Sequence, residues 1–348
     1  MKKRTTLFFL FLCLLFLYPS PHELDAAKKP HYLIKFATVA PDGSTWVKQM
    51  RAIDEEIRKK SGGRLGLRIY AGGIAGDELD VLKKIRIGQI HSAAFSGVGF
   101  GKILPMVRVL DLPFLFRTYQ EVDLIHSELK PFFTEQFRKK GFELLGWAEV
   151  GNVYLLSKKP IRTVHDLSGL KVWTWTGDPI AKETFVAMGV NPIPLAVTDV
   201  TTALNTGMID TVYAPPLGAL ALQWQNYLDY MMALPLVHST GAILISSRQY
   251  KKLPKDLSKL LKDTLKKGMT DLTTQLRDQT KEAIDVIRKS GLTITPVPKG
   301  EALNQFHAVG AEVTRKLTNK VFPQKLLDRI YMLLKRSNES SISIPKSS

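Results

Sequence analysis

Cysteine is nearly absent from this sequence: Cys13 is the only one among 348 residues. One thiol cannot form an intrachain disulfide and cannot supply a cluster of cysteine ligands for a metal. Cys13 also lies in an apolar run over residues 7–17, which we expect to be removed from the mature chain. A mature chain free of thiols suits an oxidising compartment, in which a stray cysteine could form the wrong disulfide.

The sequence also lacks any second long apolar run. The run at the N-terminus follows three basic residues, is broken by two prolines over residues 18–21, and is followed by small residues at 26–27. It is too short for a membrane-spanning helix, which needs about 20 apolar residues. We predict a secretory signal peptide over residues 1–27 and a periplasmic mature protein. An N-terminal anchor that stays uncleaved is the alternative.

Recognisable catalytic and metal-binding motifs are missing. The seven histidines are scattered, without a His-x-x-x-His or His-Glu-x-x-His pair, and no Gly-x-Ser-x-Gly motif occurs. The glycine-rich stretch at residues 97–101 lacks the spacing and the lysine of a phosphate-binding loop, so it is interpreted as a turn beside a helix. We therefore predict no catalytic residue, no metal ligand and no cofactor.

Basic residues outnumber acidic ones, with a formal net charge of +17. The lysines and arginines are spread along amphipathic segments such as residues 251–267, without an arginine-rich tract or a nucleic-acid-binding motif. A solvated basic surface is therefore favoured over a nucleic-acid interface.

Strand-like and helix-like segments alternate along the chain, which is typical of α/β architecture. Residues 65–69 alternate apolar and polar, as a strand does, whereas residues 46–60 place Trp46, Met50 and Ile57 on one helical face. Asp178 and Pro179 open another helix. Further helices are predicted at residues 77–87, 200–205, 256–289, 301–316 and 324–335, and further strands at 33–37, 93–96, 142–150, 153–157, 170–175, 193–195, 209–213 and 242–246. The Ser-rich tail, residues 337–348, is predicted to be disordered.

Several short segments, in order, resemble the solute-binding proteins of tripartite ATP-independent periplasmic (TRAP) transporters, of the dicarboxylate-receptor type. Each is weak alone, but the ordered set is specific and covers roughly residues 31–290. The segments are residues 38–42, 62–64, 73–78, 87–90, 111–116, 160–171, 188–192 and 203–210.

The resemblance implies a two-lobed periplasmic binding protein fold with a ligand cleft between the lobes and a long bridging helix, here residues 256–289. Lobe I would comprise residues 28–151 plus 241–285, and lobe II residues 152–240 plus 286–336. The protein would capture a small organic solute and dock on the small and large integral-membrane subunits of a transporter. A secreted enzyme on the same fold and an envelope protein that feeds a sensor are the alternatives.

Three positions depart from the resemblance. Trp173 aligns with an arginine that clamps a ligand carboxylate in the family, Val153 with a second arginine, and Ala214 with an asparagine. An indole cannot form the bidentate bonds of a guanidinium, but it offers apolar area. We therefore expect a largely apolar or aromatic solute, with packing of Trp173 in the core or hinge as the open alternative. The expected ligand-binding residues are Phe95, Ser96, Glu149, Val153, Trp173, Thr176, Val197, Tyr213 and Ala214.

Overall fold

The computed structural model of the chain describes residues 30–342. The predicted signal peptide at residues 1–27 and the end of the predicted tail, residues 343–348, lie outside this range. Within it, no helix is both long and apolar enough to cross a membrane.

One eight-stranded sheet runs through the molecule, with the strand order β10-β8-β4-β9-β3-β1-β2 and β7 also paired to β4. Two long antiparallel strands, β4 (Phe142–Ser157) and β9 (Val237–Ser246), form its middle. The register of this pair shifts between Glu149 and Gly151, where Gly151 has a φ of 111°. The other strands are β1 (Tyr32–Ala37), β2 (Leu65–Tyr70), β3 (Ser92–Ser96), β7 (Thr211–Ala214), β8 (Tyr230–Met232) and β10 (Thr293–Thr295), and a separate parallel pair comprises β5 (Trp173–Trp175) and β6 (Ile193–Leu195).

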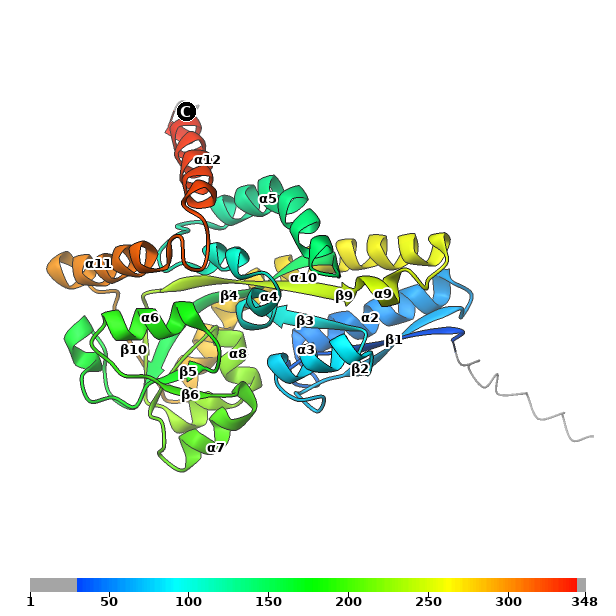
Figure 1. The fold of residues 1–348 in the computed structure, drawn as a ribbon. Coiled ribbons are helices and arrows are strands. Elements are labelled where there is room, and N and C mark those ends of the chain that lie inside the picture. The colour runs from blue at the N-terminus through cyan, green and yellow to red at the C-terminus, as the bar shows by residue number, and fades with distance from the viewer. Residues whose placement is uncertain (1–29, 343–348) are drawn as a thin grey trace, which may run out of the picture.

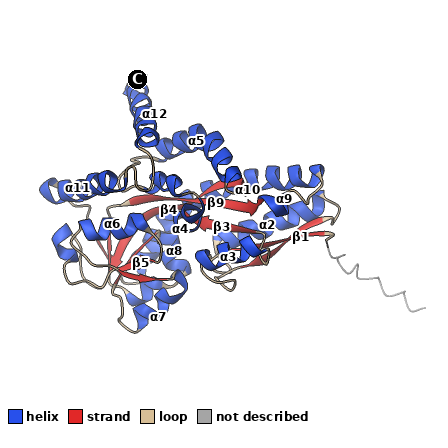
Figure 2. Ribbon diagram, viewed as in Figure 1, coloured by secondary structure: helices blue, strands red, loops and turns tan. Residues whose placement is uncertain are grey.

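Helices surround this sheet in two groups, so the molecule is a two-lobed α/β protein, as the sequence predicts (Figures 1 and 2). One lobe carries α2 (Thr45–Lys60) and α3 (Glu78–Ile87), and the other carries α6 (Pro179–Ala187), α7 (Val200–Asn205) and α8 (Pro216–Ala221). The lobe boundaries drawn from the sequence stay predictions. The remaining helices are α4 (Gly97–Ile103), α5 (Tyr119–Lys139), α9 (Ser247–Tyr250), α11 (Gly300–Leu317) and α12 (Gln324–Ile342), with short 3-10 turns η2 (Pro105–Asp111), η3 (Val164–Leu167), η4 (Val197–Asp199) and η5 (Trp224–Tyr227).

The long helix α10 (Lys255–Lys289) belongs to the cores of both lobes. Its first turns, through Leu276, pack with α2 and β1, whereas Ile287 packs in the cluster around Trp173 and Trp224. At Gly268 the approach of α2 is close, because an added Cβ would lie 2.5 Å from Ile53 Cδ1. A helix fixed in both cores can transmit the movement of one lobe to the other.

Three local predictions are wrong, and one long helix was not predicted. Residues 97–101 form helix α4 rather than a turn, and the two strands predicted over residues 142–157 are one strand, β4. Helix α5 was not predicted, although it buries an apolar face that includes Ile125, Leu129 and Phe133. Helix α12 continues to Ile342, so residues 337–342 of the predicted disordered tail are helical. The polar composition of residues 337–342 does not reveal that they continue a helix whose earlier turns are amphipathic.

Candidate ligand-binding cleft

A cleft of about 610 Å³ lies between the lobes. Its lining comes from the β1–α2 loop, the β3–α4 junction, the middle of β4, strand β5, helix α6 and the segment from β7 to α8. This volume is within the range of small-molecule sites, which commonly lie at domain interfaces.

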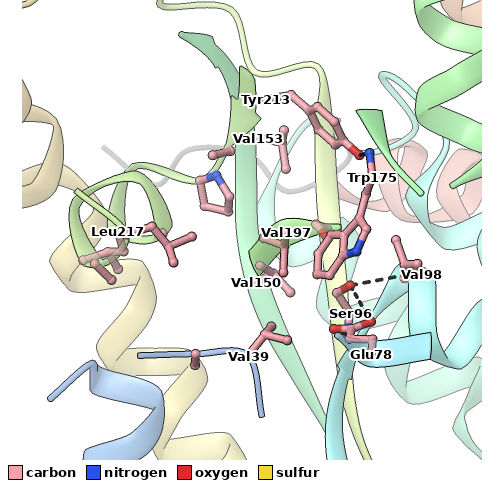
Figure 3. Close-up of a pocket in the computed structure, with 18 of the residues that line it drawn as sticks. Val39, Glu78, Ser96, Val98, Val150, Val153, Trp175, Val197, Tyr213 and Leu217 are labelled. Atoms are coloured by element: carbon pink, nitrogen blue, oxygen red, sulfur yellow. Dashed lines mark hydrogen bonds between the residues drawn. The ribbon is translucent and has the colours of Figure 1, made fainter. Parts of the chain in front are cut away.

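Branched aliphatic side chains dominate the middle of the cleft. Four segments of the chain contribute to one cavity: the loop after β1, strand β4, turn η4 and helix α8. Their side chains in the cavity are Val39, Val150, Val153, Val197 and Leu217 (Figure 3). Val150 and Val153 lie on β4 beside the register shift, which turns both side chains to the cleft. Such a wall favours the apolar part of a solute.

Trp173 lines the cleft and is also core. Its side chain is 2% exposed, its Nε1 donates to the Leu195 carbonyl oxygen at 3.1 Å, and its ring stacks on Tyr213 with centroids 4.9 Å apart. The ring of Trp224 packs edge-on against it at 5.4 Å. Trp173 is therefore part of the core and also part of the cleft wall, where its ring supports Tyr213.

Trp175 presents more surface to the cleft than Trp173 does. It is half-buried, and its Nε1 donates to Asp77 Oδ2 at 2.8 Å. Trp175 belongs to β5 and Asp77 precedes α3, so this hydrogen bond joins the two lobes across the cleft. Trp175 therefore belongs to the wall of the cleft, whereas Trp147 packs against the core, next to Phe133.

Arg108 is the one arginine that lines the cleft in the described part of the chain, and two carboxylates already hold it. Its Nη1 donates to Asp111 Oδ2 at 2.7 Å and its Nη2 to Asp178 Oδ1 at 2.6 Å, with all three side chains buried. Asp178 also accepts from the first backbone N–H groups of α6 and, at 3.3 Å, from the hydroxyl of Tyr213. A solute carboxylate would have to compete with Asp111 and Asp178 for this guanidinium.

Glu78 and Ser96 form the polar end of the cleft. Glu78 is 2% exposed; its Oε1 accepts from the Ser96 backbone N–H at 2.7 Å, and its Oε2 from Ser96 Oγ at 3.0 Å and from the Gly99 N–H at 2.7 Å. Burial raises the pKa of Glu78 to about 7.

The glycines of α4 make room for these charged groups. A Cβ added at Gly99 would lie 2.7 Å from Glu78 Oε2, and one added at Gly97 would lie 1.5 Å from Arg108 Nη1. The glycine-rich stretch therefore admits Glu78 and Arg108, both missed by sequence reasoning. A signal for Arg108 was present, because Arg108 and Asp111 are three residues apart within an otherwise apolar run at residues 103–116.

The structure brings most of the predicted ligand-binding residues together. Those that line the cleft are Phe95, Ser96, Val153, Trp173, Val197, Tyr213 and Ala214. Thr176 is exposed after β5 and Glu149 is buried on the other face of β4, so neither lines it. Strand alternation explains the second case, since the neighbouring Val150 already points to the cleft.

Glu149 instead binds helix α10. Arg277 Nε donates to both carboxylate oxygens of Glu149, at 3.1 and 3.0 Å, and Arg277 Nη2 also binds Asp123 at 2.7 Å. Glu149 directly precedes the register shift of β4, so this ion pair fixes α10 to the strand where the sheet passes from one lobe to the other. The half-buried His126 and the buried His238 lie beside it, and desolvation lowers their pKa values to about 4 and about 3.

Within residues 30–342 no group of three or more histidine, cysteine, aspartate or glutamate side chains is placed to hold a metal ion.

A two-lobed α/β fold with a ligand-sized cleft between its lobes defines a solute-binding protein. The family model for bacterial extracellular solute-binding protein family 7, DctP, matches residues 36–320. The chain therefore belongs to this family.

Two of the similar proteins are described as binding proteins. A solute-binding protein of Verminephrobacter eiseniae is 24% identical over 243 residues, 69% of this chain and 72% of the relative. The 2,3-diketo-L-gulonate-binding periplasmic protein YiaO of Escherichia coli is 23% identical over 254 residues, 70% of this chain and 75% of the relative.

Solved structures of TRAP periplasmic solute-binding proteins share the fold. One from Sulfurospirillum deleyianum, with bound succinate, has a TM-score of 0.82 at 20% identity and covers 87% of this chain and 99% of its own. One from Desulfovibrio salexigens, with bound orotic acid, has a TM-score of 0.80 at 18% identity and covers 88% and 99%. The family resemblance and the receptor function are confirmed: this is an extracytoplasmic solute receptor of the TRAP type, which binds a small organic solute and works with membrane subunits. The ligands of these neighbours are carboxylates and give no support to an apolar solute.

Proposed function

We propose that this receptor captures a largely apolar or aromatic solute in the periplasm and delivers it, chemically unchanged, to the small and large membrane subunits of its transporter. The observation that carries the proposal is the cleft lining, in which aliphatic and aromatic side chains surround the cavity and the single arginine is bound by Asp111 and Asp178.

The energetics of desolvation support this solute class. A carboxylate that leaves water without gaining charge-assisted hydrogen bonds is strongly disfavoured. Three positions that are polar in related sequences carry Val153, Trp173 and Ala214 in this chain, and all three side chains line the cleft. None of the three can return the hydrogen bonds that water gives to a carboxylate.

Closure of the lobes on the solute follows from where the contacts lie. Val39 and Ser96 belong to one lobe, and Val197 and Trp175 to the other, so a solute that touches both groups binds the closed arrangement better than an open one. Two contacts would support such an arrangement: the Asp77–Trp175 hydrogen bond connects the start of α3 to β5, and the Arg108–Asp178 salt bridge connects η2 to α6.

The test is a calorimetric screen of ligand-stripped protein against aromatic and aliphatic solutes and against succinate. We expect aromatic or aliphatic solutes to bind, and succinate not to bind below millimolar concentration. Val153→Arg should introduce a free guanidinium and transfer affinity toward carboxylates, and Val153→Met is the matched control of similar length without charge. Submillimolar binding of succinate by the unmodified protein, with no apolar solute preferred, would contradict the proposal.

Export and delivery have separate tests. N-terminal sequencing of protein from the periplasmic fraction should find a start near Ala27, and an intact Met1 in the cytosol would contradict export. Proteoliposomes with the two membrane subunits should take up the solute only when the receptor is present. Recovery of a chemically altered solute at catalytic rates would show turnover instead of delivery.

A further inference from the structure

The charged residues of the cleft are unevenly paired. In the part of the chain that the structure describes, the charged side chains that line the cleft are Asp42, Glu78, Arg108, Asp111 and Asp178. Asp42 pairs with Arg51 at 2.8 Å on the exposed rim, and Arg108 is shared by Asp111 and Asp178. Glu78 is the one among them that no cationic side chain faces within salt-bridge distance.

The hydrogen bonds of Glu78 leave acceptors toward the cleft. Its three donors, two from Ser96 and one from Gly99, are neutral and do not cancel its charge. Ser96 Oγ donates its only hydrogen to Glu78 and accepts from the Val98 N–H at 3.4 Å, so its hydroxyl has no hydrogen left for a solute. Glu78 and Ser96 can therefore bind the donor groups of a solute, and a carboxylate has none.

A second uncompensated carboxylate lies beside this end of the cleft. Asp77 is 6% exposed, and its Oδ1 has no hydrogen-bond partner in the structure, whereas its Oδ2 accepts from Trp175. Burial raises the pKa of Asp77 and of Glu78, and the nearby charge of Asp77 raises the pKa of Glu78 further.

Trp175 completes this end with an aromatic surface. Because its N–H is committed to Asp77, the ring face is what it offers to the cavity. Figure 3 shows Trp175, Ser96 and Glu78 on one side of the cavity, with Val39, Val150 and Leu217 away from them. A cation within about 6 Å of a tryptophan ring is attracted by the ring's charge distribution, and more strongly when it is desolvated.

We infer that the solute carries a protonated amine on an apolar body, with the ammonium group held by Glu78, Ser96 Oγ and the Trp175 ring and the body packed against the valine-rich wall. The inference rests on the proposed function, and it adds a charge and an orientation to the solute. An ammonium supplies both the hydrogens that Glu78 and Ser96 lack and the charge that offsets Glu78 and Asp77.

The experiment uses a matched series with one aromatic body: phenethylamine, phenethyl alcohol and phenylacetate. Calorimetry with the ligand-stripped receptor at pH 7.5 should show the amine binding about tenfold or more tightly than the alcohol, a difference of about 1.4 kcal/mol. Phenylacetate should bind weakest. A panel of longer and shorter arylalkylamines, each compared with the matching alcohol, tests other lengths of the apolar body.

Variants identify the residues responsible. Glu78→Gln should abolish the preference for the amine while the alcohol still binds, and Trp175→Leu should weaken the amine more than the alcohol. Asp256→Asn, which removes an exposed carboxylate paired with Arg64 outside the cleft, should leave the preference unchanged. If Glu78→Gln fails to fold, as judged by circular dichroism, Ser96→Ala and Trp175→Leu give the same readout with Glu78 intact.

The outcomes separate the two proposals. Equal binding of amine and alcohol throughout the panel would leave the apolar receptor standing and overturn the amine. Tightest binding of phenylacetate would overturn both. Absence of binding by every amine in the panel would overturn the inference whatever the other solutes do.

Discussion

Arg108 and Asp178 are 70 residues apart in the chain, yet they form a buried salt bridge of 2.6 Å in the wall of the cleft. Arg108 lies in η2 and Asp178 caps helix α6, so the bond connects the segment after α4 to the far wall of the cleft. Asp178 and Asp111 together occupy Nη2 and Nη1 of the guanidinium that a solute carboxylate would need. The salt bridge to Asp178 thus holds η2 to α6 and restricts the ligand chemistry.

Removal of Arg108 should destabilise the protein strongly. Arg108→Leu leaves Asp111 and Asp178 buried without their shared cation, and loss of one partner of a buried pair typically costs about 3–5 kcal/mol. Urea denaturation at pH 7.5 measures this loss. The control is Lys83→Ala, which removes an exposed ion pair with Asp80 and should change the free energy of unfolding by less than about 1 kcal/mol. A similar small effect of both variants would contradict a structural role for the bridge.

Gly97 should not tolerate a side chain. Gly97→Ala places a Cβ 1.5 Å from Arg108 Nη1, so the guanidinium or α4 must move, and overpacking of this kind typically costs about 1–3 kcal/mol. Gly218→Ala is the matched control, because its Cβ would lie 3.5 Å from Pro215 Cδ, an ordinary contact in the short helix α8. Thermal denaturation of the two variants should show a large decrease in Tm only for Gly97→Ala.

The sequence predicts the periodic parts of this fold well. Residues 46–60 and 256–289 carry helical apolar periodicity and correspond to α2 and α10 within one residue. Helix α4 was missed because glycines signal turns locally, whereas here they admit Arg108 and Glu78. Seven of the nine predicted ligand-binding residues line the cleft, and three of them, Val153, Trp173 and Ala214, were placed by alignment with the family. Glu149 does not, because strand alternation and the bulge at Gly151 decide which face of β4 a residue occupies, and a bulge is set by long-range pairing.

Substitution of Trp173 should mainly lower stability, whereas substitution of Trp175 should mainly lower solute affinity. Trp173→Phe removes the hydrogen bond to Leu195 and part of the stack on Tyr213 in a side chain 2% exposed, so we expect a lower Tm and less than about threefold loss of solute affinity. Trp175→Phe removes the hydrogen bond to Asp77 in a half-buried ring, so affinity should decrease more than stability. Calorimetry and thermal denaturation of both variants decide this. A tenfold loss of affinity confined to Trp173→Phe would show that Trp173 contacts the solute directly.

Two histidines, the half-buried His126 and the buried His238, should each decrease the stability of the protein in acid. His126 Nε2 lies 3.1 Å from Thr240 Oγ1 and its ring stacks on Trp147, and His238 Nδ1 lies 3.0 Å from Asn152 Oδ1. His238 Nε2 is also 3.6 Å from Glu149 Oε1, but Arg277 already pairs with that carboxylate and repels a second positive charge. Burial therefore keeps both imidazoles neutral, with pKa values lowered to about 4 for His126 and about 3 for His238.

The sign of the pH effect follows from these values. Between about pH 4 and pH 6.5 the unfolded chain binds protons at both histidines and the folded chain does not, so the free energy of unfolding decreases as the pH falls through this window. At pH 5 the loss relative to pH 8 is about 2 kcal/mol for each histidine. Glu78, with its raised pKa, acts in the opposite direction over part of the same range, because its folded form holds a proton that the unfolded form releases. Urea denaturation from pH 8 to pH 4.5 should show a smaller loss of stability on acidification in His126→Gln and His238→Gln than in the unmodified protein, and a larger loss in Glu78→Gln. A profile in which neither histidine variant differs in slope from the unmodified protein would mean that these imidazoles accept protons in the folded state.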